Sequence, residues 1–503
     1  MVVPRPVALE STTDAPFVLG PTARISVAGA GAEAVALLLR DALRTECSRE
    51  LVVVHEPPEH GDIAIVVADH EGPEGHSAEG YSLEIAAEGV RVGAATAAGA
   101  FRGVQTLRQL VPASCSGDPL TIDAARVRDY PRYAYRGAML DVARHFLPVS
   151  DVERFIDAIA LLKVNHLHLH LTDDQGWRIE IVSWPALTRI GGATAVGGGA
   201  GGFYSQDEYR GLVEYAAARH ITIVPEIDMP GHTNAALASY PELNRDGVAP
   251  AAYTGTEVGF STLLTDDATT ERFLADVVRE VAALTPGPYL HIGGDECLST
   301  PREDFLRFIE HAARLVAEQG KTPVGWHEMG ACDALPPGTV GQYWDYRTPR
   351  GAAADDLLSF VRQGGAAILS PADVAYLDIV YEEGDDIGLD WADGPTTLAD
   401  ALAWDPARIV PGLGDAHILG VEAPLWTETV ETIEQAEEMV FPRLAAIAEI
   451  GWSPAPADTE PVEAARDLPD FARRLARLAE HWDASGTRYR RVDGVPWPEG
   501  AVH

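Results

Sequence analysis

The hydrophobic pattern of the chain changes at about residue 130. Beyond that point, short apolar runs rich in β-branched residues alternate with longer stretches of helical periodicity. The apolar runs predict eight strands, at residues 136–141, 164–171, 221–226, 289–292, 323–326, 340–343, 367–370 and 418–422. Helical periodicity predicts helices at residues 151–162, 206–219, 270–284 and 303–318. Repeated strand–helix units favour a parallel sheet, and eight of them predict a closed (β/α)8 barrel.

The part before residue 130 has a pattern typical of a small α+β domain. Helical spacing predicts one helix over 31–43 and a second after Thr96, a residue type that caps helix N-termini. Short β-branched or alternating runs predict strands at residues 51–54, 63–67, 81–85 and 88–92. The polar, turn-rich stretch at 118–130 is predicted to be a connection without regular structure.

These patterns divide the chain into two domains. Residues 1–130 are predicted to form the small α+β domain, and residues 131–503 the TIM-barrel domain, which we expect to carry the chemistry. Within the barrel domain, 371–417 shows no clear helix and is expected to be irregular. A last helix is expected at 470–481.

The charge balance excludes two classes of partner. The chain has 38 basic and 76 acidic residues, which gives a net charge of -38. Phosphate binding needs clustered Lys and Arg, so we expect no nucleic-acid partner. Repulsion from anionic lipid headgroups argues equally against a membrane partner.

The N-terminal sequence shows no secretory signal, and no apolar run is long enough to span a bilayer. As numbered, the chain is therefore expected to be cytoplasmic, or secreted if a leader was removed. Its four cysteines show no CxxC spacing, so a zinc site with sulfur ligands is not expected. The sequence assigns no oligomeric state.

Polar, acidic and aromatic residues gather where the predicted barrel strands end, the edge at which such barrels carry their active sites. They are Arg144, Asp173, Asp228, His232, Asp295, Glu296, Trp326, Trp344, Tyr376, Asp378, Trp426 and Glu428. Tryptophan rings stack on the C–H faces of sugars, while carboxylates and arginine hydrogen-bond sugar hydroxyls. An acidic pair accompanied by several tryptophans therefore indicates a carbohydrate site.

Several longer motifs make this indication specific. They are HLHLTDDQGWRIEI, VPEIDMPGHTNAALASYPEL, HIGGDE, GWHE, QYW and APLWTE near the strand ends, and ATAAGAFRGVQTL in the first domain. In this order along nearly the whole chain, they resemble family 20 of the glycoside hydrolases, the exo-β-N-acetylhexosaminidases, and most closely its bacterial members. The resemblance implies no cofactor and no metal. It also implies β-linked N-acetylhexosaminides, such as chitooligosaccharides and glycans, as substrates.

The acidic pair is unusual because Asp295 and Glu296 are adjacent. Extended backbone would point their side chains to different sides, which suits a separate nucleophile and acid poorly. The resemblance implies another scheme, in which the 2-acetamido group of the substrate is the nucleophile and forms an oxazolinium ion. Glu296 would then be the general acid and base, Asp295 would hold the acetamido N–H, and Tyr376 would hydrogen-bond the acetamido oxygen.

The resemblance also implies roles for the surrounding residues. Arg144 and Glu428 would hold O3 and O4 of the sugar, and Asp378 would hold O6. The set that would wall the pocket is Trp326, Trp344 and Trp426. The set that would orient and tune Glu296 is Asp173, Asp228 and His232.

Two alternatives come from other functional classes. His168 and His170 lie on one face of the second predicted barrel strand, and an H-x-H pair of this kind is typical of metal-dependent barrel hydrolases. The remaining metal ligands are not evident at later strand ends. The other alternative is a non-catalytic sugar-binding protein of the same fold, which fold alone does not exclude.

Overall fold

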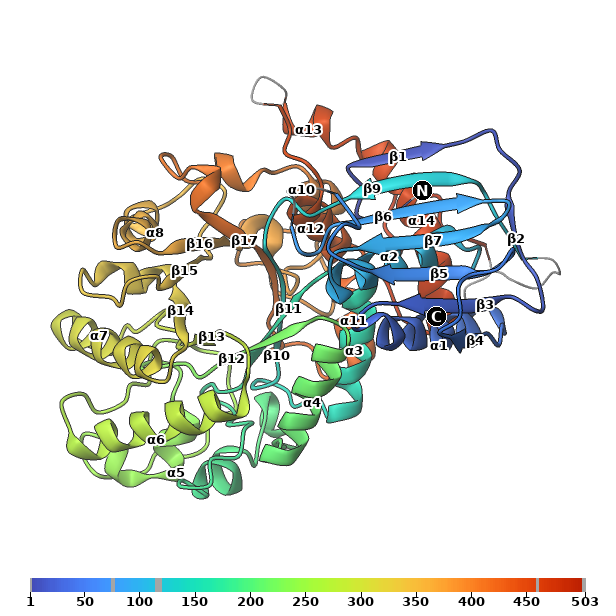
Figure 1. Cartoon of the computed structure of the whole chain (residues 1–503). Helices are drawn as coiled ribbons and strands as arrows, with labels where there is room; N and C mark the ends of the chain where they lie inside the picture. The colour runs from blue at the N-terminus through green and yellow to red at the C-terminus, as the bar shows by residue number, and fades with distance from the viewer. Residues whose placement is uncertain (1, 74–76, 114–119, 458–460, 500–503) are drawn as a thin grey trace.

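The larger part of the structure is a barrel, seen in a computed structural model that describes residues 2–73, 77–113, 120–457 and 461–499 (Figure 1). Its eight strands are β10 (Tyr135–Asp141), β11 (His166–His170), β12 (Thr222–Glu226), β13 (Tyr289–His291), β14 (Thr322–Trp326), β15 (Val340–Tyr343), β16 (Ala366–Leu369) and β17 (Ile418–Leu425). They are parallel and pair in sequence order, and β17 closes the barrel by pairing with β10. Each predicted segment overlaps one strand, so the predicted fold class is confirmed.

Helices follow the strands and lie around the barrel (Figure 1). They are α3 (Val149–Leu161), α4 (Gln206–Ala218), α5 (Asn234–Ser239), α6 (Ala268–Leu284), α7 (Arg302–Glu318), α8 (Ala353–Arg362), α11 (Ile433–Val440) and α12 (Arg443–Trp452). All seven residues of β10 are buried, because one face of a barrel strand points inward and the other packs on helices. Among the described residues, no helix is long and apolar enough to span a bilayer.

The segment between β16 and β17 departs from the strand–helix repeat, as expected. It contains only two short α-helices, α9 (Ala372–Ala375) and α10 (Leu398–Leu402), and two 3₁₀ turns, Pro406–Arg408 and Asp415–His417. Its length places Tyr376, Asp378 and Trp391 at the mouth of the barrel, where they line a cavity.

The N-terminal part is built on one seven-stranded sheet, with strand order β1-β9-β6-β7-β5-β3-β4. Its strands are β1 (Ala8–Ser11), β3 (Arg24–Ala28), β4 (Val52–Val54), β5 (Ile63–Val67), β6 (Tyr81–Ala86), β7 (Gly89–Ala94) and β9 (Ala125–Asp129). Two helices, α1 (Ala32–Cys47) and α2 (Ala97–Leu110), pack on the sheet. The C-terminal helix α14 (Leu468–Ser485) packs against both, so the end of the chain returns to the N-terminal part (Figure 1).

The prediction of an irregular connection at 118–130 was wrong for residues 120–129. Leu120–Ile122 forms a strand, β8, that pairs with β2 (Phe17–Leu19), and Ala125–Asp129 forms β9. Strand β9 is polar at every second position, and its buried residues Ala125, Val127 and Asp129 alternate with exposed arginines. Pairing with β1 and β6 on its two sides stabilises a segment whose own composition is weakly apolar. Residues 118 and 119 lie outside the described residues.

Charged residues join the two parts of the molecule. Glu79, in the loop before β6, accepts hydrogen bonds from Arg136 of β10 (2.6 Å), from Arg102 of α2 (2.7 Å) and from Asn165 (2.8 Å). Burial by itself would raise the pKa of Glu79, but the charges of Arg136 and Arg102 outweigh it and lower the pKa to about 2. This carboxylate therefore fixes the N-terminal sheet against the first barrel strand.

We expect the variant Glu79→Gln to lose about 3–5 kcal/mol of unfolding free energy near neutral pH, because it leaves two buried guanidinium groups without their anion. The lowered pKa means that this contribution is present above the ordinary pKa of 4.5 and is lost as the pH falls toward about 2. Denaturant titrations at about pH 7 and about pH 3 should therefore show a smaller difference between variant and wild type at the lower pH.

The matched control is Glu84→Gln, which removes an exposed ion pair with Arg126 in the same sheet. Exposed pairs contribute about 0–1 kcal/mol, so the control should remain close to wild type. Equal losses in the two variants would contradict the assignment of Glu79 as the junction.

Candidate active site

A cavity of about 500 Å³ lies at the carboxyl ends of the barrel strands. Nine of the twelve site residues predicted from the sequence line it, namely Arg144, His232, Asp295, Glu296, Trp344, Tyr376, Asp378, Trp426 and Glu428. They follow β10, β12, β13, β15, β16 and β17, so residues far apart in the sequence meet at one place. The cavity also has lining residues that the sequence did not indicate, namely Thr256, Val258, Asp345, Tyr346, Leu389 and Trp391.

The loop after β13 brings two adjacent carboxyl groups to this cavity. Gly293 has φ +64°, and a Cβ there would lie 1.8 Å from Oδ1 of Asp228, so only glycine fits. Glu296 also has positive φ, at 47°. The extended backbone assumed from the sequence was therefore wrong at this position. The left-handed turn allows Asp295 and Glu296 to line the same cavity.

His232 links these carboxyl groups to the barrel interior. Its Nε2 lies 3.7 Å from Oδ2 of Asp295 and 3.5 Å from Oε2 of Glu296, and its Nδ1 lies 3.2 Å from Oδ1 of Asp173. Burial would lower the pKa of His232, but the carboxylates of Asp173, Asp295 and Asp228 raise it well above the ordinary value. The imidazole is therefore cationic and faces both candidate catalytic groups.

Asp295 is almost fully buried. Burial raises the pKa of its carboxyl to about 7; His232 opposes the increase, and the nearby carboxylates of Glu328 and Glu296 add to it. Asp295 therefore holds its negative charge weakly near neutral pH. A positive charge or an N–H donor placed beside it would favour the ionised form.

Arg144 is a second buried cation of the site. It lies 2.9 Å from Oδ2 of Asp173, 3.2 Å from Oδ2 of Asp141 and 3.9 Å from Oε1 of Glu428. Its guanidinium also lies over the Trp426 ring, 4.7 Å from the centroid. These contacts hold the planar guanidinium in one orientation, which suits the recognition of neighbouring hydroxyl groups.

Several buried acceptor atoms at this cavity have no partner. In the described part of the chain, no hydrogen-bond donor contacts Oδ1 of Asp295, either carboxyl oxygen of Asp378, or Oε2 of Glu428. Buried polar atoms are nearly always paired in folded proteins, so these oxygens indicate a ligand. The ligand must bring donors, such as hydroxyl groups and an amide N–H.

Aromatic rings form the rest of the wall. The indole N–H of Trp344 donates to both oxygens of Glu328, at 3.0 and 2.9 Å, which fixes its ring plane. The Trp391 ring lies 6.2 Å from that of Trp344 and 5.8 Å from that of Tyr376, in edge-to-face arrangements. A cavity with aromatic walls and unpaired acceptors fits a sugar ring.

Comparison with known proteins agrees with this geometry. The sequence model for the glycosyl hydrolase family 20 catalytic domain matches residues 133–455, and that for domain 2 of the same family matches residues 1–130. The chain is 42% identical over 499 residues to a β-N-acetylhexosaminidase of Cellulomonas fimi, a match that covers 99% of this chain and 97% of the relative.

The chain belongs to family 20 of the glycoside hydrolases.

Solved structures of the family superpose closely on the whole chain. The family 20 β-N-acetylhexosaminidase of Streptomyces coelicolor A3(2) has a TM-score of 0.92 and 47% identity, covering 99% of this chain and 98% of its own. A mutant β-hexosaminidase of Streptomyces plicatus, solved in complex with its product GlcNAc, has a TM-score of 0.92 and 46% identity, covering 99% and 97%. The predicted family, the enzyme class and the β-N-acetylhexosaminidase function are confirmed.

The alternative functions are not favoured in this family 20 enzyme. His168 and His170, the predicted H-x-H ligands, lie inside the barrel, where their ring nitrogens face the carboxylates of Glu226, Glu422 and Asp173. Neither histidine lines the cavity. The non-catalytic alternative is not favoured either, because the matched relatives are β-N-acetylhexosaminidases and the adjacent carboxyl groups Asp295 and Glu296 line the cavity.

Three predicted site residues lie deeper than the cavity wall. Trp326 was expected to wall the pocket, but it is fully buried, and its indole N–H donates to Glu226 at 3.0 Å. Its ring lies 5.9 Å from that of Trp426, so it supports the wall from below. Asp173 and Asp228 are buried behind the cavity, beside His232 and the Gly293–Gly294 turn respectively.

Trp391, Glu328 and Glu226 were not indicated as site residues by the sequence. Trp391 lies in the irregular segment, far from any predicted strand end. Glu328 lies in the GWHE motif, and Glu226 lies in the VPEIDMPGHTNAALASYPEL motif, at the end of a predicted strand. An acidic residue at the end of a buried barrel strand was the available signal for Glu226.

Cys297, next to Glu296, packs against the apolar core and is half-buried. Its Sγ lies 3.2 Å from the carbonyl oxygen of Asp295. Burial and the carboxylates of Asp228 and Asp295 raise the pKa of the Cys297 thiol well above its ordinary value. The sulfur therefore stays protonated and is a poor nucleophile.

We expect the variant Asp378→Asn to be more stable than wild type by about 1–3 kcal/mol near neutral pH. Burial and the neighbouring Glu428 raise the pKa of Asp378 well above its ordinary value of 3.8, so the buried carboxyl costs stability above that pH. Denaturant titration at about pH 7 measures the effect, and the difference should vanish below the ordinary pKa. The control Asp373→Asn removes a carboxylate that is paired with Arg347 and should lower stability; a similar loss in Asp378→Asn would contradict the prediction.

Proposed function

We propose that this family 20 enzyme removes a terminal β-linked N-acetylhexosamine from the non-reducing end of its substrate, with retention of the anomeric configuration. One observation carries the proposal: Asp295 and Glu296 line the same cavity and lie 3.7 and 3.5 Å from the same nitrogen of His232. Oδ1 of Asp295 has no donor among the described residues, so this carboxyl is suited to accept an acetamido N–H of the substrate. We therefore assign the nucleophile to the substrate, as in the known exception to the two-carboxylate scheme.

In the first step, Glu296 donates its proton to the glycosidic oxygen. The carbonyl oxygen of the 2-acetamido group attacks the anomeric carbon as the bond from that carbon to the leaving oxygen breaks. The product is a cyclic oxazolinium ion that carries a positive charge. The free Oδ1 of Asp295 accepts the acetamido N–H, and its negative charge offsets the charge of the ring. Tyr376 donates to the acetamido oxygen and directs it toward the anomeric carbon.

In the second step, Glu296 acts as a base. It removes a proton from a water molecule, the water oxygen bonds to the anomeric carbon, and the bond from that carbon to the acetamido oxygen breaks. The acetamido group is restored, and Glu296 recovers the proton that it gave to the leaving group. Each step inverts the anomeric carbon, so the two together retain its configuration.

Binding of the sugar ring is assigned to the unpaired acceptors and to Arg144. Arg144 and Glu428 are placed at O3 and O4, and Asp378 is placed at O6, while Trp344 and Trp426 stack on the ring and the acetamido group. Hydroxyls held by buried side chains carry no further sugar, which accounts for cleavage at chain ends only. Because GlcNAc and GalNAc differ at O4, the Arg144–Glu428 pair is where the two sugars would be distinguished.

The relatives support the substrate class. The Streptomyces plicatus enzyme binds GlcNAc as its product, and an N,N'-diacetylchitobiase of Vibrio harveyi is among the curated relatives, with 28% identity over 504 residues. We extend this chemistry to the present chain, with chitooligosaccharides and the ends of glycans as its substrates.

Substrate assistance predicts a steep loss of kcat when the N-acetyl group is replaced by N-trifluoroacetyl. Fluorine withdraws electrons from the carbonyl oxygen and weakens it as a nucleophile. The measurement compares the para-nitrophenyl β-glycosides of the N-acetyl sugar and of its N-trifluoroacetyl analogue. Inhibition constants of the two free sugars show whether the analogue also binds more weakly. A kcat that hardly changes would indicate an enzyme nucleophile and would overturn the mechanism.

The variant Glu296→Gln should lose about 10²–10⁴-fold in kcat/KM on diacetylchitobiose, whose leaving group needs a proton. It should lose much less on a para-nitrophenyl glycoside, whose leaving group departs as a stable anion. Asp295→Asn is the matched comparison, because it weakens stabilisation of the oxazolinium ion and should slow both substrates to a similar extent. Normal turnover of diacetylchitobiose by Glu296→Gln would refute its role as the acid.

A further inference from the structure

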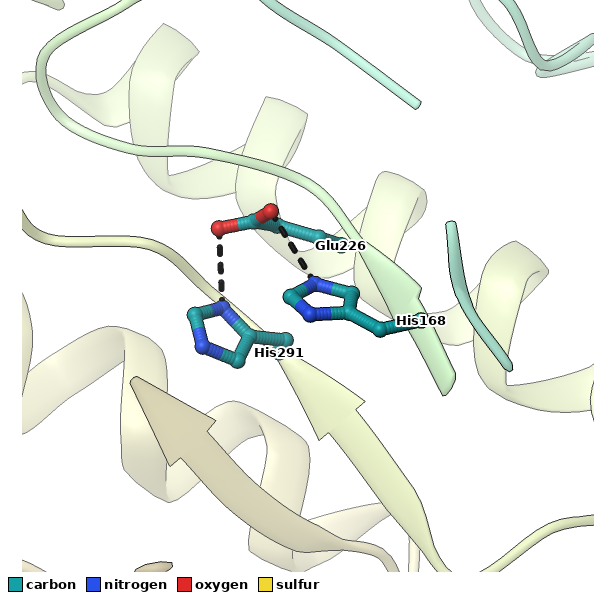
Figure 2. Close-up of side chains that lie close together, drawn as sticks. All are labelled: His168, Glu226 and His291. Carbon is teal, nitrogen blue, oxygen red and sulfur yellow. Dashed lines mark ion pairs between the residues drawn. The ribbon is translucent and has the colours of Figure 1, made fainter. Parts of the chain in front are cut away.

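Glu226, at the end of β12, is a fully buried carboxylate without a role in the steps above. Figure 2 shows its two oxygens facing two imidazoles: Oε1 lies 2.9 Å from Nδ1 of His291, and Oε2 lies 3.0 Å from Nε2 of His168. Oε1 also accepts the indole N–H of Trp326 at 3.0 Å, and Oε2 contacts Nδ1 of His170. Glu226 therefore gathers side chains from β11, β13 and β14 inside the barrel.

His170 carries this arrangement toward the cavity. Its Nδ1 faces Glu226, and its Nε2 lies 2.8 Å from Oδ2 of Asp173. An ionised carboxylate only accepts hydrogen bonds, so a ring between two of them must carry a proton on both nitrogens. In agreement, although burial opposes it, Glu226 and Asp173 raise the pKa of His170 well above its ordinary value.

Asp173 contacts Arg144 and His232 in addition to His170. Its Oδ2 also contacts Arg144 at 2.9 Å, and its Oδ1 lies 3.2 Å from Nδ1 of His232. The other nitrogen of His232 faces Glu296 at 3.5 Å. The series Glu226, His170, Asp173 and His232 thus alternates anion and cation from the barrel interior to the imidazole that faces Glu296.

We propose that Glu226 is a positioning residue of the reaction, which acts through His170, Asp173 and His232 to hold Glu296 as the acid. The proposal rests on the proposed function, in which Glu296 protonates the leaving group. Removing the charge of Glu226 leaves His170 free to drop one proton and to turn its ring. Asp173 then loses a charged hydrogen-bond donor. Its carboxylate is held less firmly and orients His232 less well.

The test is the variant Glu226→Gln, with Glu422→Gln as its matched control. Glu422 lies in the same barrel interior and accepts from His168 and Gln342, both at 2.8 Å, but it does not contact His170 or Asp173. Each variant removes one buried carboxylate that faces His168, so both should lower the melting temperature. Only Glu226→Gln breaks the series that leads to Glu296.

The readout is the ratio of kcat/KM for diacetylchitobiose to kcat/KM for its para-nitrophenyl counterpart. We expect the ratio to fall about tenfold in Glu226→Gln, part of the 10²–10⁴-fold that acid–base help contributes, and to stay unchanged in Glu422→Gln. Equal losses on both substrates in Glu226→Gln, or the same change of ratio in Glu422→Gln, would overturn the proposal, because a structural role affects both substrates alike.

Glu296→Gln, measured in parallel, distinguishes a failure of the proposed function from a failure of the role of Glu226. If that variant shows no dependence on the leaving group, the proposed function fails. If it shows the dependence and Glu226→Gln does not, only the role of Glu226 fails.

If Glu226→Gln does not fold, nitrogen NMR of the histidine rings in the wild-type protein decides. Two protonated ring nitrogens on His170 at neutral pH support the proposal, and a neutral ring overturns it.

Discussion

Asp173 is fully buried at the top of the barrel and contacts three cationic side chains, Arg144, His170 and His232. An isolated carboxylate in such a place would cost several kcal/mol and would take up a proton instead. The three cations lower the pKa of Asp173 well below its ordinary value, in spite of its burial. The charge is thus retained only because Arg144, His170 and His232 converge on it, which makes their geometry interdependent.

The cavity needs a second kind of polar group, one that the fold leaves without a partner. Asp378, Glu428 and Asp295 each keep at least one buried oxygen unpaired among the described residues. Such atoms lower the stability of the protein, and a ligand with hydroxyl groups and an amide N–H has the donors that they lack. Paired carboxylates such as Asp173 therefore fix the positions of the side chains around the cavity, whereas the unpaired ones line the cavity and face the ligand.

The backbone of the loop after β13 links the buried residues behind the cavity to the carboxyl groups that line it. Gly293 allows close contact with Asp228, and Gly294 allows close contact with Met329. The positive φ of Glu296 turns that side chain to the same cavity as Asp295. Strained conformations of this kind persist at functional sites when the surroundings determine them. Here the surroundings are the barrel strands and His232, which hold the loop in one geometry.

The amino-acid sequence was sufficient to predict the eight barrel strands and to nominate Asp295 and Glu296, because strand periodicity and the strand-end motifs are contained in short stretches of chain. The strand at Ala125–Asp129, the depth of Trp326 and the network around Glu226 were not predicted. These features depend on which side chains from separate strands meet once the barrel closes. Local sequence therefore determined what chemistry was available at each strand end, and the tertiary structure alone decided which charges are paired and which face the ligand.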